Sequence, residues 1–260
     1  MCIAYLAWQS HPDWPLFIAA NRDEFHARPA RPAVPWEDHP DVIAGIDEAA
    51  GGTWLGVTRQ GRFAVLTNYR DLNLSGPSNP VSRGELVKNF LTSQDSALDY
   101  AEQAAVQGGM YAGFNLLIGD RQHASYVSNQ WPGPRRAWVL TPGRYVVSNH
   151  LLDTAWPKTE RLREVLNHFP VEHLERSVNR VFELLKDNTQ APDHELPHTG
   201  LSLEKERLLS SPFIVSPDYG TRCSTVIAIH KSGRALFSEL TYDRQGQPVE
   251  RHDWPWQLPD

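Results

Sequence analysis

The order of strand-like and helix-like segments is the feature of this chain that most restricts its fold. Short β-branched and aromatic segments bounded by Gly or Pro predict strands, and apolar residues three or four apart predict helices. The strands come in batches that are separated by pairs of helices, whereas a parallel sheet alternates strand with helix. This order predicts an α+β protein with antiparallel sheets and helices packed outside them.

The predicted elements cover most of the chain. The expected strands are residues 2–8, 15–20, 42–45, 53–58, 62–67, 113–118, 123–128, 137–140, 145–147, 221–230, 234–240 and 248–252. The expected helices are residues 83–92, 96–107, 158–167, 171–186 and 202–209. Proline-rich 28–40 and polar 187–200 are expected to be loops and candidate lids. Without a repeat or a Gly/Ser-rich linker, residues 1–260 are expected to form one domain.

Composition and charge exclude several classes of function. The 260 residues carry a formal net charge of −6 with scattered Lys and Arg, which argues against a nucleic-acid or anionic-membrane surface. Two cysteines, Cys2 and Cys223, provide no disulfide framework, which suits a reducing compartment. The apolar runs are shorter than the ~18 residues of a membrane span, and the N-terminus lacks the basic region of a signal peptide. We therefore expect a cytoplasmic protein without a membrane span.

One literal motif match is not expected to bind metal. His194-Glu195-Leu196-Pro197-His198 has the spacing of a zinc-protease motif, which requires a helix that presents both imidazoles on one face. Pro197 removes a backbone donor and disfavours a helical conformation at Leu196. The segment is therefore expected to be a loop, and we expect no metal site.

The chain begins Met1-Cys2-Ile3, and Cys2 is the first candidate for chemistry. A small second residue favours removal of Met1, which would leave Cys2 with both a thiol and a free α-amine. An α-amine has a pKa of about 7.7–8.0, so it can act as the general base for the thiol of its own residue. The alternative is that Cys2 merely begins a buried strand, because free cysteine packs well as a small hydrophobe.

A run of four polar residues, Asn21-Arg22-Asp23-Glu24, follows the second predicted strand. If residues 2–8 and 15–20 form a hairpin, the end of the second strand lies beside Cys2. Arg22 would then favour the thiolate, and Asp23 would hold the protonated amine. The alternative is a solvated turn after a strand.

Two asparagines and one arginine stand at the ends of other predicted strands. The side-chain amides of Asn68 and Asn149 are candidate donors to an oxyanion, and the alternative for each is ordinary turn capping. Arg222 precedes the β-branched run 223–229. It is a candidate to clamp a substrate carboxylate or to orient Cys2, and the alternative is a surface arginine.

These residues fall in sequence blocks that together resemble the NRDE, or Transport-and-Golgi-organisation, family. The signature that names the family corresponds to Asn21-Arg22-Asp23-Glu24. The other similar blocks are the Met1-Cys2 start and residues 51–57, 66–70, 82–84, 113–117, 148–150, 156–158 and 221–225. Each block is weak alone, but in this order, from residue 1 to about residue 230, they are specific.

The resemblance implies an N-terminal nucleophile hydrolase fold, which is a four-layer αββα sandwich similar in layout to choloylglycine hydrolase and penicillin V acylase. It implies a cysteine nucleophile, a supporting Arg and Asp, two oxyanion asparagines and a late arginine: Cys2, Arg22, Asp23, Asn68, Asn149 and Arg222. In that group the Arg and the Asp are not adjacent, so Asp23 and Glu24 remain alternatives for the acidic role. The expected substrate-binding residues are Glu24, Trp54 and Tyr69.

The expected function is a cysteine amidohydrolase that cleaves a linear amide or a related acyl substrate and uses no cofactor. Members of the resembling family are linked to haem trafficking and to lipid or acyl-CoA handling. The alternative is therefore a non-catalytic carrier of haem or of a lipid or acyl-CoA ligand on the same fold. Under either reading the expected partner is a small molecule.

Overall fold

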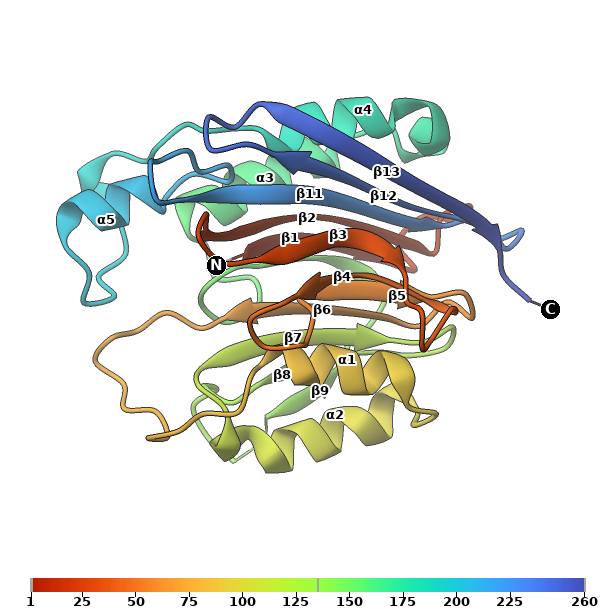
Figure 1. The fold of residues 1–260 in the computed structure, drawn as a ribbon, viewed down its shortest axis with the longest axis horizontal. Coiled ribbons are helices and arrows are strands. Elements are labelled where there is room, and N and C mark those ends of the chain that lie inside the picture. The colour runs from red at the N-terminus through yellow and green to blue at the C-terminus, as the bar shows by residue number, and fades with distance from the viewer. Residues whose placement is uncertain (1, 135, 260) are drawn as a thin grey trace.

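Two antiparallel β-sheets face each other at the centre of the molecule (Figure 1), in a computed structural model that describes residues 2–134 and 136–259. The first sheet has the strand order β10 (Gly143–Val147), β1 (Cys2–Trp8), β2 (Leu16–Phe25), β11 (Tyr219–Ile229), β12 (Arg234–Tyr242) and β13 (Pro248–Gln257). The second has the order β3 (Ala30–Pro35), β4 (Val42–Asp47), β5 (Leu55–Thr58), β6 (Phe63–Asn68), β7 (Phe114–Gly119), β8 (Ala124–Ser128) and β9 (Ala137–Val139).

Helices cover the outer face of each sheet (Figure 1). The α-helices are α1 (Gly84–Thr92), α2 (Ala97–Val106), α3 (Pro157–Asn167), α4 (Leu174–Leu185) and α5 (Leu203–Leu208), and short 3-10 turns span Gln107–Met110, Val171–His173 and Asp193–Glu195. The pair α1 and α2 packs on the second sheet, and the pair α3 and α4 packs on the first. The predicted α+β fold with a four-layer αββα arrangement is confirmed.

The burial pattern of β1 shows how the sequence builds these layers. Successive strand residues point to opposite faces of a sheet. Ala4 and Leu6 join the apolar core between the sheets, whereas Ile3 and Tyr5 join the separate core beneath α3 and α4. Because both faces of the strand are covered, β1 is apolar at nearly every position instead of alternating with polar residues.

Two expectations about loops and strand ends are wrong. The proline-rich segment 28–40 contains strand β3, and β13 continues past residue 252 to Gln257. Both are edge strands, where proline is tolerated because one side of the strand needs no ladder hydrogen bonds. Proline in these segments therefore marks the edge of a sheet.

Strand β2 runs five residues beyond its predicted end and contains the polar run Asn21–Glu24. The polar side chains are tolerated because they find partners. The Asn21 amide donates hydrogen bonds of 2.9 Å to the carbonyl oxygens of both Leu185 and Pro212. The run is therefore a paired strand between β1 and β11, and not a solvated turn.

Candidate functional site

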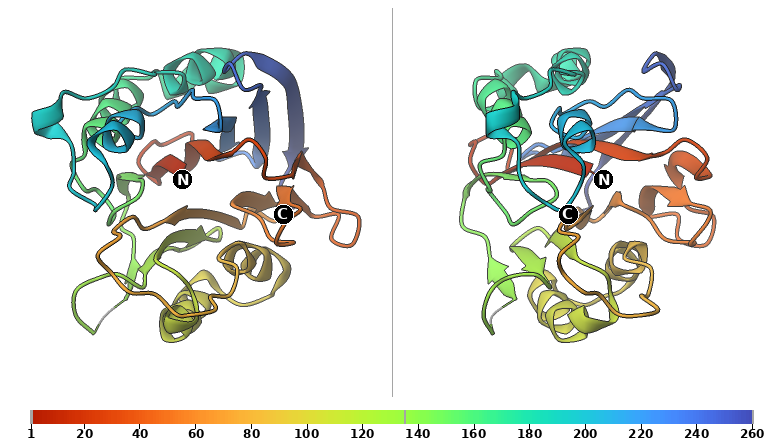
Figure 2. Two further views of the ribbon diagram at one scale, coloured as in Figure 1. Left: turned by 60° about the vertical axis from the view of Figure 1, so that its left-hand side comes forward. Right: turned by 90° about the vertical axis from the view of Figure 1, so that its left-hand side faces the viewer.

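Cys2 lies where β1 begins, at the end of the sandwich on the side of α5, and Figure 2 shows the N-terminus between the two halves of the molecule. A pocket of about 470 Å³ opens beside it. Its lining comes from both sheets and from the segment before α1: Cys2, Arg22, Asp23, Glu24, Phe25, Arg28, Asp47, Ala50, Thr53, Trp54, Leu66, Asn68, Pro80, Val81, Ser82, Arg83, Gly84 and Ala112. The described residues therefore place a thiol at the wall of a pocket large enough for a small ligand.

Arg22 lies directly beside Cys2, as the predicted hairpin requires. In the strand register Cys2 pairs with Arg22, and Arg22 pairs with Cys223 on β11. The Arg22 side chain is 5% exposed, and its guanidinium lies 4.1 Å from the centre of the Trp54 ring and 3.5 Å from the Asp47 carboxylate. Arg22 therefore carries a fixed positive charge against the wall of the pocket.

The electrostatic surroundings of the Cys2 thiol favour its protonated form. Burial raises the pKa of the thiol, and this is the largest influence on it. The Arg22 cation and a hydrogen bond from the Asp23 backbone act in the opposite direction. A thiol in this setting needs a general base before it can act as a nucleophile.

Asp23 and Glu24 occupy different depths of the pocket. Asp23 is buried, its carboxylate accepts a 2.7 Å hydrogen bond from the Thr221 hydroxyl, and burial raises its pKa. The Thr221 hydroxyl is oriented to donate because its oxygen accepts from the backbone N–H of Ile214. Glu24 is only partly buried and accepts from the backbone N–H of Phe25. Of the two alternatives for the acidic role, Asp23 is the one whose charge and backbone N–H act on the Cys2 thiol.

Asn68 and Asn149 meet although 81 residues separate them in the sequence. Asn149 is fully buried, and its Nδ2 donates to Asn68 Oδ1 at 3.0 Å and to the Asn68 carbonyl oxygen at 3.3 Å. Asn68 lines the pocket, whereas Asn149 does not. The structure therefore places the first amide at the pocket wall and the second directly behind it.

The most informative residue that sequence reasoning missed is Lys158. It is 1% exposed, and its Nζ donates a 2.7 Å hydrogen bond to Asn149 Oδ1. Burial lowers the pKa of its ammonium, and the nearby Asp23 and Cys2 act in the opposite direction. Lys158 follows Pro157 at the start of α3, where the helix dipole disfavours a cation. A lysine directly after the proline that begins a helix was therefore a signal in the sequence that an interaction outside the helix stabilises this residue.

A close backbone approach places a second unpredicted cation, Arg83, in the pocket lining. A Cβ at Gly52 would lie 2.5 Å from the backbone of Gly84, so only glycine lets these two segments touch. Thr53 N–H also donates to the Gly84 carbonyl at 3.2 Å. The Arg83 guanidinium donates to the Gly113 carbonyl at 2.9 Å, and it forms no ion pair within residues 2–134 and 136–259.

Two residues expected at the site lie elsewhere. Arg222 is the extra residue of a β-bulge between Thr221 and Cys223, and its guanidinium donates to main-chain carbonyls of the β2–β3 connection, including Phe25 at 3.0 Å. Tyr69 packs against the His150 ring at 4.9 Å. Neither residue lines the described pocket. The other expected site residues line it, Trp54 included, except for Asn149, which contacts the lining residue Asn68.

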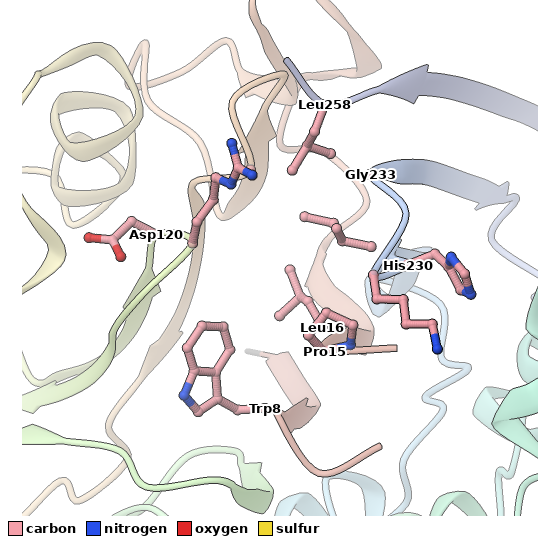
Figure 3. Close-up of a pocket in the computed structure, with 11 residues that line it drawn as sticks. Trp8, Pro15, Leu16, Asp120, His230, Gly233 and Leu258 are labelled. Atoms are coloured by element: carbon pink, nitrogen blue, oxygen red, sulfur yellow. The ribbon is translucent and has the colours of Figure 1, made fainter. Parts of the chain in front are cut away.

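A separate hollow of about 140 Å³ lies at the opposite end of β1, lined in part by Trp8, Leu16 and His230 (Figure 3). The Asp120 carboxylate points away from it and accepts from Ala97 N–H at 3.0 Å. Among the described residues that line it there is no cysteine, serine or threonine nucleophile. We therefore place the candidate chemistry at the Cys2 pocket.

The fold and the site together define an αββα protein with a cysteine-centred pocket at one end of its two sheets. The chain belongs to the Transport and Golgi organisation 2 family, whose model matches residues 1–244. It is 36% identical over 264 residues to the Transport and Golgi organization protein 2 homolog of Bos taurus, with 92% of each chain covered. The Homo sapiens homolog is 32% identical over 262 residues, again with 92% of each covered.

Two solved structures match most of the length of this chain. A Caenorhabditis elegans ortholog of N-acylethanolamine-hydrolyzing acid amidase has a TM-score of 0.48 and 11% identity, with 87% of this chain and 92% of that chain covered. A mutant conjugated bile acid hydrolase from Clostridium perfringens has a TM-score of 0.48 and 8% identity, with 99% and 98% covered. None of the described helices has both the length and the apolar character that crossing a bilayer requires.

Proposed function

We propose that this protein is a cysteine amidohydrolase that cleaves a linear amide or a related acyl substrate. The observation that carries the proposal is the position of Cys2, at the start of a strand and in the wall of a pocket that Arg22 and Asn68 also line. The proposal requires removal of Met1, which lies outside the described residues, so that processing stays a prediction.

The proposed reaction has two stages, which are acylation of Cys2 and hydrolysis of the resulting thioester. The α-amine of Cys2 takes the thiol proton, and the thiolate attacks the substrate carbonyl carbon to form a tetrahedral oxyanion. The ammonium returns the proton to the leaving nitrogen as the C–N bond breaks, which leaves a thioester on Cys2 and releases the amine. Water, deprotonated by the α-amine, then hydrolyses the thioester to a carboxylic acid and restores the thiol.

The surroundings of Cys2 support this division of roles. Because burial raises the thiol pKa, the thiol needs a general base. The α-amine of Cys2 belongs to the same residue and is therefore always close to the thiol. The buried Asp23 carboxylate would hold the ammonium form, and the Arg22 cation, which lowers the pKa of the thiol, would favour the thiolate. Asn68 would donate its amide N–H groups to the oxyanion.

The lining of the pocket supports a substrate with both apolar and polar parts. Trp54, Leu66 and Val81 provide apolar surface for an acyl chain, and Arg83 provides a cation for a polar group. Glu24, which is partly buried and also lines the pocket, would contact the same ligand. These residues are the proposed substrate-binding set, and Glu24 and Trp54 come from the sequence prediction.

Intact-mass measurement with a thiol-alkylating amide tests the proposal. We expect the purified protein to lack Met1 and to be labelled by iodoacetamide at Cys2 much faster than at Cys223, which is 4% exposed. Cys2→Ala should abolish hydrolysis of any amide substrate found in a screen while circular dichroism remains native. A retained Met1, or turnover by Cys2→Ala, would refute the mechanism.

The second candidate function is a non-catalytic carrier of haem or of a lipid or acyl-CoA ligand. The raised thiol pKa favours it, because a protonated thiol is a poor nucleophile. Among the described lining residues, Cys2 is the only side chain of a type that ligates haem iron, so haem cargo would use that thiol. Haem titration should then give a Soret band that Cys2→Ala changes, whereas acyl-CoA binding that survives Cys2→Ala, without hydrolysis, would support a lipid carrier.

A further inference from the structure

Lys158 is a buried amine without a carboxylate partner. Within the described residues it forms no ion pair, and its recorded hydrogen bond is the 2.7 Å donation to Asn149 Oδ1. Burying an ammonium, or leaving a buried amine with one acceptor, costs free energy of folding. A buried lysine of this kind therefore suggests a functional role. The helix-start position adds a further cost. The surroundings of Asn149 show what this lysine can do.

The hydrogen-bonding capacity of each group fixes the orientation of the two amides. The Asn68 backbone carbonyl oxygen can only accept, so the Asn149 NH₂ group faces Asn68. The Asn149 oxygen then faces Lys158, whose Nζ donates to it whether or not the amine is charged. The Asn68 oxygen then accepts from Asn149. Within the part of the chain that the structure describes, the Asn68 NH₂ group has no protein acceptor. Its N–H groups are left for a ligand in the pocket that Asn68 shares with Cys2.

The same chain of contacts connects three elements that carry the site. Lys158 is on α3, Asn149 follows β10, and Asn68 ends β6. Ser148, beside Asn149, donates from its hydroxyl to the Cys2 carbonyl oxygen at 2.9 Å and lies 3.1 Å from Asn149 Oδ1. The position of the Cys2 backbone and the orientation of the Asn68 amide are therefore fixed by the same polar cluster.

We propose that Lys158 is a positioning residue that acts through Asn149 to turn the N–H groups of Asn68 toward the carbonyl oxygen of a substrate at Cys2. The proposal rests on the proposed function of Cys2 and adds the residue that sets the oxyanion donor. Without Lys158, the Asn149 oxygen loses its donor, and the 3.3 Å hydrogen bond to the Asn68 carbonyl oxygen alone opposes a half-turn of the Asn149 amide. After such a turn Asn68 presents its oxygen, which repels an oxyanion.

The test compares two reactions of the same thiol in the Met1-processed protein. Acylation of Cys2 by a p-nitrophenyl ester of a short fatty acid passes through a tetrahedral oxyanion, whereas alkylation by iodoacetamide does not. In Lys158→Met we expect the acylation rate to fall about tenfold or more. The alkylation rate at its high-pH plateau, measured by intact mass, should change less than about twofold because no oxyanion forms.

A pH profile separates positioning from a change in charge. The titratable and charged groups that face Lys158 are Cys2, Asp23, Arg70 and Glu206. Loss of the lysine charge alone would move the pH midpoint of both reactions equally, because both use the same thiolate. Loss of the oxyanion donor lowers the acylation plateau selectively.

Asn149→Asp is the second variant, and it keeps an acceptor for Lys158 but removes the N–H donor to Asn68. It should show the same selective loss of acylation, which tests the Asn149–Asn68 step of the proposal independently of the folding of Lys158→Met. Lys88→Met, on the exposed face of α1, is the matched lysine control and should leave both rates unchanged. Normal acylation in either Asn149→Asp or Lys158→Met, or an equal loss in both reactions, would overturn the proposal alone. Failure of the unsubstituted protein to be acylated would overturn the proposed function and this inference with it.

Discussion

Cys2 and Arg22 lie directly opposite each other on neighbouring antiparallel strands. Facing side chains on such a pair are about 4.5–5.5 Å apart at Cβ, so the arginine charge acts on the thiol at short range. The Trp54 ring and the Asp47 carboxylate hold the guanidinium in that position. This relationship leads to the first of four predictions.

Replacing Arg22 with methionine should move the pH midpoint of Cys2 alkylation to higher pH, because the cation that favours the thiolate is lost while burial still raises the thiol pKa. The plateau rate should be unchanged. Arg28→Gln is the control, because it removes the other partner of Asp47 and leaves Arg22 in place. A midpoint that does not move in Arg22→Met would show that the arginine does not tune the thiol.

The two cysteines should differ sharply in reactivity. Cys223 is buried opposite Arg22 on the neighbouring strand β11, and burial raises its thiol pKa well above the usual value, so it should resist alkylation in the native protein. Cys2→Ala should therefore abolish rapid labelling, whereas Cys223→Ala should leave it intact. Equal labelling of both variants by intact mass would contradict this assignment.

Gly52→Ala should destabilise the protein by about 1–3 kcal/mol, because the new methyl group would lie 2.5 Å from the Gly84 backbone. Urea unfolding measures the loss. Gly76→Ala is the matched control, since nothing lies within 4 Å of its Cβ position, and it should change stability by less than about 0.5 kcal/mol. A stability in Gly52→Ala equal to that of the control would show that the two segments can separate freely.

Lys158 should make stability depend on pH in the alkaline range. Burial lowers its pKa below the usual 10.5, so over the interval up to that value the unfolded chain holds a proton that the folded chain has lost. With more protons bound in the unfolded state, the free energy of unfolding rises with pH. Urea unfolding at several alkaline pH values should show this rise in the unsubstituted protein and a smaller one in Lys158→Met. Identical slopes would mean that the lysine titrates normally in the fold.

Most secondary-structure elements and the antiparallel character of the fold could be predicted from the sequence, whereas strand β3 and the full lengths of β2 and β13 could not. Apolar periodicity and turn residues are local properties, so the strand that starts at Cys2, its hairpin partner and the two helix pairs were all predicted. The hairpin also brought Arg22 to Cys2. The family followed from the order of short blocks, and the comparisons confirmed it. The catalytic roles of the site residues stay predictions.

Which polar residues meet depends on the packing of distant segments. Lys158, Asn149 and Asn68 are brought together by the packing of α3 against the first sheet and by the contact between the ends of β10 and β6, which no local pattern encodes. The bulge that turns Arg222 toward the β2–β3 connection is likewise a property of strand register. Local sequence sets the conformation of each segment, but the orientation of a buried amide depends on donors and acceptors that arrive from distant parts of the chain.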